Sequence, residues 1–205
     1  MEFNVLNHHR HAARYFNNEK VPVAAIKEIL GEAHYAPSGI NMQTWHFVIV
    51  DSADKKAALA AAGRGGNGQQ IEEAPAVVVI FSDTEIRSRL EKAVTTGKWE
   101  NETQEKWAFR IKDHYLDEVS HYTAQYKSDY LAMNTGLVTM NLMYAINDAG
   151  YHGNIILGFN KGPQINEILE VDPRFRPELV IVFGKTDKPG EPHYRLPLEE
   201  IIEVK

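Results

Sequence analysis

Two arginines near the start of the chain have the type and spacing of an anion-binding pair. Arg10 and Arg14 occur four residues apart in RHAARYF, so a helix through this segment would place both guanidinium groups on one face. A guanidinium donates several N–H groups to one anion, which makes the pair a candidate binding site. The alternative is a solvated basic face on an opening helix, which contributes little to stability.

A second candidate is the polar loop within APSGINMQTWHF, residues 36–47. Ser38, Gly39, Asn41 and Gln43 provide small hydrogen-bonding groups with little bulk. This composition suits a loop that lies against a polar, planar ligand. The same residue types are the ordinary residues of turns, so a plain turn is the alternative interpretation.

A third candidate surrounds a group of glycines. Gly63, Gly65 and Gly68 formally match the fingerprint of dinucleotide-binding folds. That fingerprint has to follow a strand and open a helix, whereas here an alanine-rich helix precedes it. We therefore predict a loop in which Asn67 and Gln70 are the polar contacts for a ligand, with a flexible surface loop as the alternative.

Cysteine and histidine usage restricts the possible chemistry. The chain contains no cysteine, which excludes disulfides, thiolate metal sites, cysteine-ligated iron–sulfur clusters and a cysteine nucleophile. Any redox chemistry must therefore use a bound cofactor. We expect no metal site at His8, His9 and His11, because adjacent histidines point apart on a helix and no acidic partner lies at ligand spacing.

The composition is that of an ordinary globular chain that acts on small molecules. Of the 205 residues, 43% are hydrophobic and 24% are charged, and the formal net charge is −6. A negative balance argues against a nucleic-acid or acidic-membrane binder. We find neither the apolar run of a signal peptide nor an apolar span long enough to cross a membrane. We therefore expect one domain over residues 1–205 in the cytoplasm, with no nucleic-acid or membrane partner.

Helices and strands must position these candidates. Pro22 and apolar residues at helical spacing predict a helix that ends before Pro37, and Ser52 is expected to cap the alanine-rich helix. Charged and aromatic residues between 83 and 127 predict amphipathic helices with a break near 95–100. A short helix is predicted at 163–169. Apolar runs bounded by turn residues predict strands at residues 45–50, 76–82, 152–159 and 179–184.

The longest predicted helix runs from Ser128 or Asp129 to Asn147 and is closed by Gly150. Apolar residues occur nearly all round it, so it should be buried in the core or in a subunit interface. Strands separated by helices indicate an α+β or α/β class, with one mixed sheet between helical layers.

Five short segments occur in one order along the chain: RHAARYF, APSGINMQTWHF, GNGQQIEEAP, IILGF and YRLPLEE. Taken together they resemble the FMN-dependent nitroreductase family, and the resemblance covers essentially the whole chain. It implies an α+β fold with a central mixed sheet flanked by helices. It also implies a homodimer that binds FMN in two equivalent pockets at the dimer interface.

The resemblance implies cofactor-binding roles residue by residue. The residues that match phosphate and ribityl positions, or neighbour them, are Arg10, His11, Ala12, His193 and Arg195. Arg14 matches the position beside the pyrimidine edge of the flavin. The other residues that match positions along the ring or the ribityl chain are Asn67, Gln70, Ile156, Leu157 and Gly158, the last three near the reactive N5. The residues that would come from the other subunit are Pro37, Ser38, Gly39 and Asn41. Gln43 and Trp45 match positions that hold the loop and the strand in place.

Four positions depart from the family pattern. Ala12 replaces the usual serine and loses a phosphate-binding hydroxyl, and Thr44 replaces the usual proline. Gln70 stands where some members have lysine, and Leu157 stands where some carry an acid near the substrate. These departures affect the expected substrate preference more than the expected FMN binding.

The implied activity is NAD(P)H oxidation through FMN by ping-pong exchange. NADPH or NADH delivers hydride to flavin N5 and leaves, and a nitroaromatic, quinone or activated alkene then accepts the electrons in the same pocket. No side chain need act as a catalytic acid or base, and Arg14 would stabilise negative charge at N1 and the C2 carbonyl. The alternatives are a divergent flavin oxidase or dehalogenase of the same fold, and a non-catalytic redox sensor or flavin store.

Overall fold

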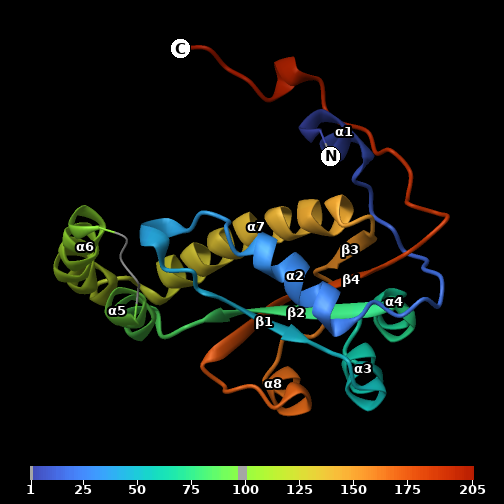
Figure 1. Cartoon of the computed structure of the whole chain (residues 1–205), viewed down its shortest axis with the longest axis horizontal. Coiled ribbons are helices and arrows are strands. Elements are labelled where there is room, and N and C mark those ends of the chain that lie inside the picture. The colour runs from blue at the N-terminus through green and yellow to red at the C-terminus, as the bar shows by residue number, and fades with distance from the viewer. Residues whose placement is uncertain (1, 97–100) are drawn as a thin grey trace.

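The computed structural model describes residues 2–96 and 101–205, apart from the side chains of residues 107 and 111–113. Its centre is a four-stranded sheet in the order β1-β2-β4-β3, in which each neighbouring pair is antiparallel (Figure 1). The two central strands come from the apolar runs AVVVIFS and LVIVFG, which have the β-branched residues that strands favour. The strands are β1 (Trp45–Ile49), β2 (Ala76–Asp83), β3 (His152–Ile156) and β4 (Phe175–Gly184).

The predicted α+β class is confirmed, but the expected mixture of strand directions is not found among the four strands. Parallel pairing is limited, in the described residues, to an isolated bridge between Ala12 and Gly153 beside the sheet. Strands that are apolar on both faces are typical of parallel sheets. Here they are antiparallel strands buried by helices on both faces, so their apolar runs did not indicate strand direction.

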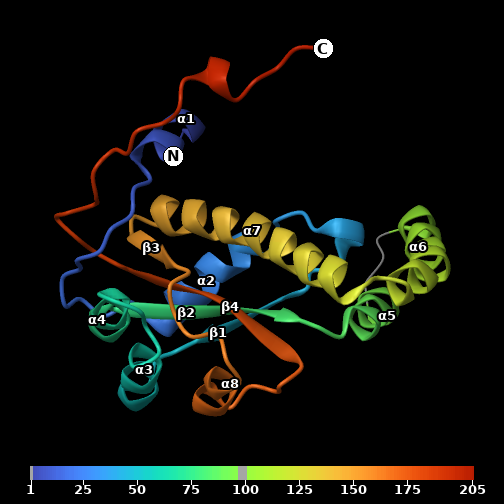
Figure 2. The same cartoon turned by 180° about the vertical axis from the view of Figure 1, so that it is seen from behind.

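Helices cover both faces of the sheet, as Figures 1 and 2 show from opposite sides. One face packs against α2 (Val23–Ala33) and α7 (Ala124–Asp148), and the other packs against α3 (Ala53–Ala60), α4 (Asn67–Glu73) and α8 (Gln164–Leu169). Alternate residues of each central strand pack against the helices on opposite faces of the sheet. On β2, Val78 and Ile80 belong to the first cluster, whereas Val77 and Val79 belong to the second.

A third apolar cluster lies beyond one end of the sheet. Helices α5 (Ile86–Thr96) and α6 (Glu102–Ser120) confirm the predicted amphipathic helices. Ile86 and Leu90 of α5 pack with Leu131 of α7 and with Met42, which joins this cluster to the polar loop. The predicted break near 95–100 falls largely on residues 97–100, which lie outside the described residues, as does Trp99.

The N-terminal cap of helix α7 lies five or six residues earlier than the sequence predicts. Thr123 caps it by accepting a hydrogen bond from the Tyr126 N–H at 3.1 Å. Ser128, one of the predicted caps, instead accepts a hydrogen bond from Arg176 on β4 at 2.8 Å. The predicted end is close to the observed one, since α7 ends at Asp148, two residues before Gly150, which has a φ of +76°.

The loop predicted around Asn67 and Gln70 is wrong, because both residues lie on helix α4. Glycines make the tight connection between α3 and α4 possible. A Cβ on Gly63 would lie 2.5 Å from the Gly68 nitrogen, and a Cβ on Gly68 would lie 2.6 Å from the Ala60 oxygen. These glycines therefore allow α3 and α4 to pack closely. As a result, the amide side chains of Asn67 and Gln70 lie on a helix rather than on the predicted loop.

Both ends of the chain leave the helical layers. Helix α1 (Phe3–His9) and the C-terminal residues that include η2 (Leu198–Glu200) extend away from the sheet in Figure 1. Residues 191–205 are exposed throughout, including large apolar side chains such as Tyr194 and Ile201. Over residues 2–96 and 101–205, none of the helices combines the length and hydrophobicity needed to cross a bilayer.

Candidate functional site

The N-terminal arginine segment lies against the edge strand β3. Ala12 forms the parallel bridge with Gly153, and the Ala13 N–H donates to the Gly153 oxygen at 3.1 Å. Next to this bridge, the Nε atom of Arg10 is buried and has no hydrogen-bond partner in the described structure. Buried guanidinium nitrogens are normally paired, so Arg10 has the donor that a bound anion would need.

His152 on β3 lies beside the same segment and was not identified from the sequence. Its Nδ1 is buried without a hydrogen-bond partner among the described residues. Burial lowers the pKa of His152, and the positive charges of Lys185 and His11 lower it further. A bound anion would oppose this effect, since a negative charge favours the protonated imidazole.

Three amide side chains form a hydrogen-bonded row from α4 to β3. Asn67 Nδ2 donates to the Gly158 oxygen at 2.9 Å, Gln70 Nε2 donates to Asn67 Oδ1 at 3.4 Å, and Asn154 Nδ2 donates to Gln70 Oε1 at 2.8 Å. A Cβ on Gly158 would lie 2.6 Å from Asn67 Nδ2, so this row requires glycine at 158. The structure thus brings Asn67, Gln70 and Gly158 together, and it adds Asn154, which sequence reasoning missed.

The two residues before Gly158 differ in what they can offer a ligand. Ile156 is only 2% exposed and packs in the core between the sheet and α8, so its side chain does not face solvent. Leu157 is 62% exposed and presents its side chain outward. Of these two predicted site residues, only Leu157 therefore offers an apolar side chain to a ligand.

The C-terminal segment passes close to the arginine segment at Gly190 and then extends away from the sheet and its helices. Gly190 has a φ of +98°, and a Cβ there would lie 2.6 Å from the Ala12 oxygen and 3.0 Å from the His11 Cβ. Beyond this crossing His193 is exposed, and Arg195 donates to the His193 and Tyr194 oxygens at 3.1 and 3.0 Å. These two hydrogen bonds stay within the segment of Arg195 itself, so they do not join it to Arg10.

The loop from Pro37 to Asn41 lies at the opposite end of α7 from β3 and the arginine segment (Figures 1 and 2). It contains η1 (Gly39–Asn41) and is fixed to α7 by a bond from the Gly39 N–H to Asn134 Oδ1 at 2.8 Å. Within the loop, Ser38 Oγ accepts a bond from the Gln43 N–H at 2.9 Å. One chain therefore does not bring Pro37, Ser38, Gly39 and Asn41 to the arginine segment. Arg14, the remaining predicted site residue, is exposed to solvent.

These donors fit FMN better than a metal ion. The described residues contain no group of three or more histidine and acidic side chains that could hold a metal. The orphaned nitrogen of Arg10 suits a phosphate, because charge-assisted hydrogen bonds from arginine to phosphate are strong. The neutral amides of Asn67, Gln70 and Asn154 suit hydroxyl and carbonyl groups of the kind that a ribityl chain and a flavin ring present.

Comparison with known proteins identifies the family. The model of the nitroreductase family matches residues 8–185. Spy0809 of Streptococcus pyogenes, a protein named as an NAD(P)H nitroreductase, is 39% identical over 207 residues and covers 99% of both chains. The CLA biosynthesis enone reductase of Lactiplantibacillus plantarum is 30% identical over 182 residues, covering 86% of this chain and 82% of that protein.

Solved structures agree with this result. A nitroreductase family protein from Streptococcus pneumoniae superimposes with a TM-score of 0.91 at 41% identity, covering 100% of both chains. The structure of a protein from Exiguobacterium sibiricum, described as a nitroreductase in complex with FMN, superimposes with a TM-score of 0.85 at 30% identity, covering 100% of this chain and 98% of that one. The chain therefore belongs to the nitroreductase family, and it is an oxidoreductase of that family.

Proposed function

We propose that this chain is an FMN-dependent NAD(P)H oxidoreductase that reduces small organic acceptors. The observation that carries the proposal is the buried Nε of Arg10 beside β3, which has no partner in the described structure. The similar protein from Exiguobacterium sibiricum is described as a complex with FMN. The chemistry that FMN supplies when bound is acceptance of hydride from NADPH or NADH at N5 and its transfer, by ping-pong exchange, to a second molecule.

The residues of this chain hold and tune the cofactor. Arg10 binds the phosphate beside His11 and Ala12, and the exposed C-terminal residues His193 and Arg195 complete the phosphate site. The amide row of Asn67, Gln70 and Asn154 positions the ribityl chain and the ring. Arg14 places a fixed positive charge at the pyrimidine edge, where it stabilises negative charge that accumulates during reduction.

The active unit is a homodimer in which each site combines two chains. The N-terminal arginine segment and the loop from Pro37 to Asn41 lie at opposite ends of α7 in one chain, so a second chain supplies the loop that completes each site. Residues 1–205 form one domain in this assembly, and the expected location is the cytoplasm.

The acceptor class is nitroaromatics, quinones and activated alkenes. The named activity of the enone reductase from Lactiplantibacillus plantarum supports the last of these. The exposed side chain of Leu157 gives the acceptor an apolar contact where some relatives carry an acid.

An anaerobic spectral titration tests the proposal. The purified protein is expected to be yellow, to lose its visible flavin absorbance on addition of NADPH or NADH, and to regain it when menadione, a nitroaromatic or an enone is added. A protein that neither retains nor rebinds added FMN would overturn the proposal. A flavoprotein that NAD(P)H fails to bleach would instead be a sensor or store, and recovery with oxygen alone would indicate an oxidase.

A further inference from the structure

The loop proposed to complete the site of the second chain has a strained backbone. Ile40, Asn41 and Gln43 have φ values of +54°, +53° and +47°. Side chains other than glycine are disfavoured in this left-handed region, and a β-branched isoleucine is disfavoured most. Such a conformation persists only where the surrounding structure fixes it, so the contacts that hold this segment determine its shape.

Helix α7 fixes the first half of the loop. The Gly39 N–H donates to Asn134 Oδ1, and the hydroxyl group of Tyr130 occupies the space that a Cβ on Gly39 would need. Ser38 and Gln43 close the loop on itself through the bond to Ser38 Oγ. These contacts leave the carbonyl groups at the end of the strained segment to be fixed from elsewhere.

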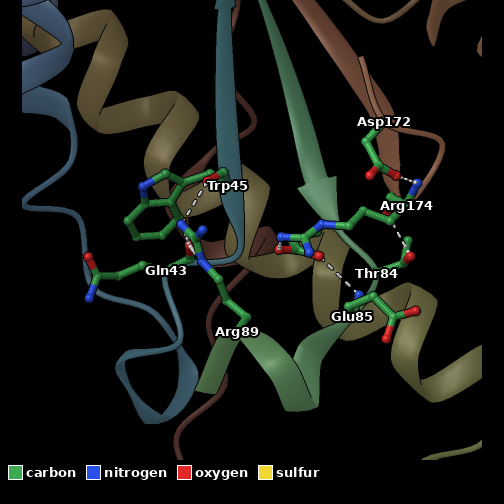
Figure 3. A network of polar contacts seen from close by, with 8 residues as sticks. Gln43, Trp45, Thr84, Glu85, Arg89, Asp172 and Arg174 are labelled. Atoms are coloured by element: carbon green, nitrogen blue, oxygen red, sulfur yellow. Dashed lines mark hydrogen bonds and ion pairs between the residues drawn. The ribbon is translucent and has the colours of Figure 1, made fainter. Parts of the chain in front are cut away.

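Arg89 of α5 provides that second attachment, as Figure 3 shows. Its Nε and Nη2 atoms donate to the Gln43 oxygen at 3.1 and 2.8 Å, and Nη2 also lies 3.4 Å from the Trp45 oxygen. One guanidinium therefore binds the last strained residue and the first residue of β1. Arginine suits this role because its donors form a rigid planar fork.

A buried ion pair lies behind this attachment. Asp83 at the end of β2 is fully buried, accepts a bond from Arg174 Nη2 at 2.9 Å and also accepts the Glu85 N–H at 3.1 Å. The Asp83 carboxylate favours the charged form of Arg89 and opposes the burial that disfavours it. The acid thus stabilises the positive charge of Arg89, although it makes no direct hydrogen bond to the loop in the described structure.

We propose that Arg89 is a positioning residue that holds residues 38–43 in the shape needed for the FMN site of the second chain. The inference rests on the proposed function, because the loop's contact with FMN belongs to it. A preformed loop binds its ligand without first losing conformational freedom. Loss of the Arg89 attachment should therefore weaken FMN binding even though Arg89 itself touches no cofactor.

The test compares four variants by FMN affinity of the apoprotein, thermal stability and hydrogen exchange. Arg89→Met removes the donors, and Arg89→Lys keeps the charge without the fork. Arg87→Met is the matched control, since Arg87 lies on the same helix, is exposed and pairs with Glu91 at the surface. Arg174→Met controls for loss of stability, because it breaks the buried ion pair and does not contact the loop.

Arg89→Met should weaken FMN binding about tenfold and speed the hydrogen exchange of amides 38–43. Arg89→Lys should give an FMN affinity and exchange rates between those of Arg89→Met and the wild type. Arg87→Met should change neither quantity, and Arg174→Met should lower the melting temperature at unchanged FMN affinity. Wild-type affinity and exchange in Arg89→Met would overturn the inference, as would an equal loss of affinity in Arg174→Met. If the wild type fails to bind FMN, the proposed function falls, and the exchange of residues 38–43 alone decides whether Arg89 positions the loop.

Discussion

Arg10 is the residue through which the site can be tested most directly. Its buried Nε lacks a partner in the described structure, and charge-assisted hydrogen bonds contribute about 1.5–3 kcal/mol each. Arg10→Met should therefore weaken FMN binding by roughly one to two orders of magnitude. Riboflavin, which lacks the phosphate, is the control ligand and should bind both forms equally. Equal losses for both ligands in a fluorescence titration would contradict the assignment of Arg10 to the phosphate.

A second residue, His46, is expected to make the stability of the fold depend on pH. His46 on β1 stacks on Phe175 with ring centroids 4.2 Å apart. Burial lowers the pKa of His46 below its ordinary value of 6.5, the charges of Arg89 and Arg174 lower it as well, and Asp83 opposes them. Because the folded pKa is the lower one, the unfolded chain takes up the proton first as pH falls. Stability should therefore be greatest above pH 6.5 and should decrease as pH falls below it.

His46→Phe keeps an aromatic ring on Phe175 and removes the titrating group. The wild-type melting temperature should fall between roughly pH 7 and pH 5.5, and the variant should show a smaller decrease. Part of the decrease should remain, because His152 also has a lowered pKa and contributes with the same sign. An identical slope in His46→Phe would show that His46 does not contribute to the pH dependence.

The sequence is most informative about the candidate site where side chains, rather than backbone groups, make the contacts. Asn67 and Gln70 were proposed as polar contacts, and they lie in one hydrogen-bonded row. Asn154, His152 and Arg89 were missed for physical reasons. The first two lie on a short edge strand that resembles other strands, and the partners of Arg89 are backbone carbonyls, which have no sequence signature. Their roles depend on tertiary contacts, such as the 46-residue separation between Gln43 and Arg89.

At the scale of elements, local signals predicted most of the helices and strands. Pro22, Ser52 and the apolar strand runs predicted elements that the structure contains. Boundaries were less reliable where a polar residue had another partner, as Ser128 has in Arg176. The glycines between α3 and α4 indicated a loop from their composition, whereas close packing of the two helices uses the same glycines.

The start of α7 provides a test at this scale. Thr123→Ala removes the cap on the Tyr126 N–H and should lower the free energy of unfolding by about 1 kcal/mol. Asp129→Ala is the control, since Asp129 lies inside the helix and its side chain accepts an exposed bond from Gln125. It should change stability by less than about 0.5 kcal/mol. Chemical denaturation measures both, and a larger effect at Asp129 would place the helix start where the sequence suggested.

At the scale of the whole molecule, α7 carries a stripe that one chain leaves uncovered. Ala132, Met133, Gly136 and Leu137 are exposed and fall on one face of the helix. Met133 is 61% exposed and Leu137 is 46% exposed. Small and apolar residues on a helix otherwise buried against the sheet are typical of an interface. The sequence predicted that this helix is apolar nearly all round, and the proposed dimer would give the exposed stripe a partner.

Leu137→Lys tests the proposed dimer and the proposed shared site together. A lysine without a partner is costly to bury, so the variant should dissociate in sedimentation equilibrium. It should also lose FMN affinity, because the N-terminal arginine segment and the loop from Pro37 to Asn41 lie at opposite ends of α7 in one chain. Ala58→Lys adds the same charge at an exposed position of α3, on the other face of the sheet, and should leave both properties unchanged. A monomeric variant that bound FMN as tightly as the wild type would mean that one chain completes the site, and the loop would then need another role.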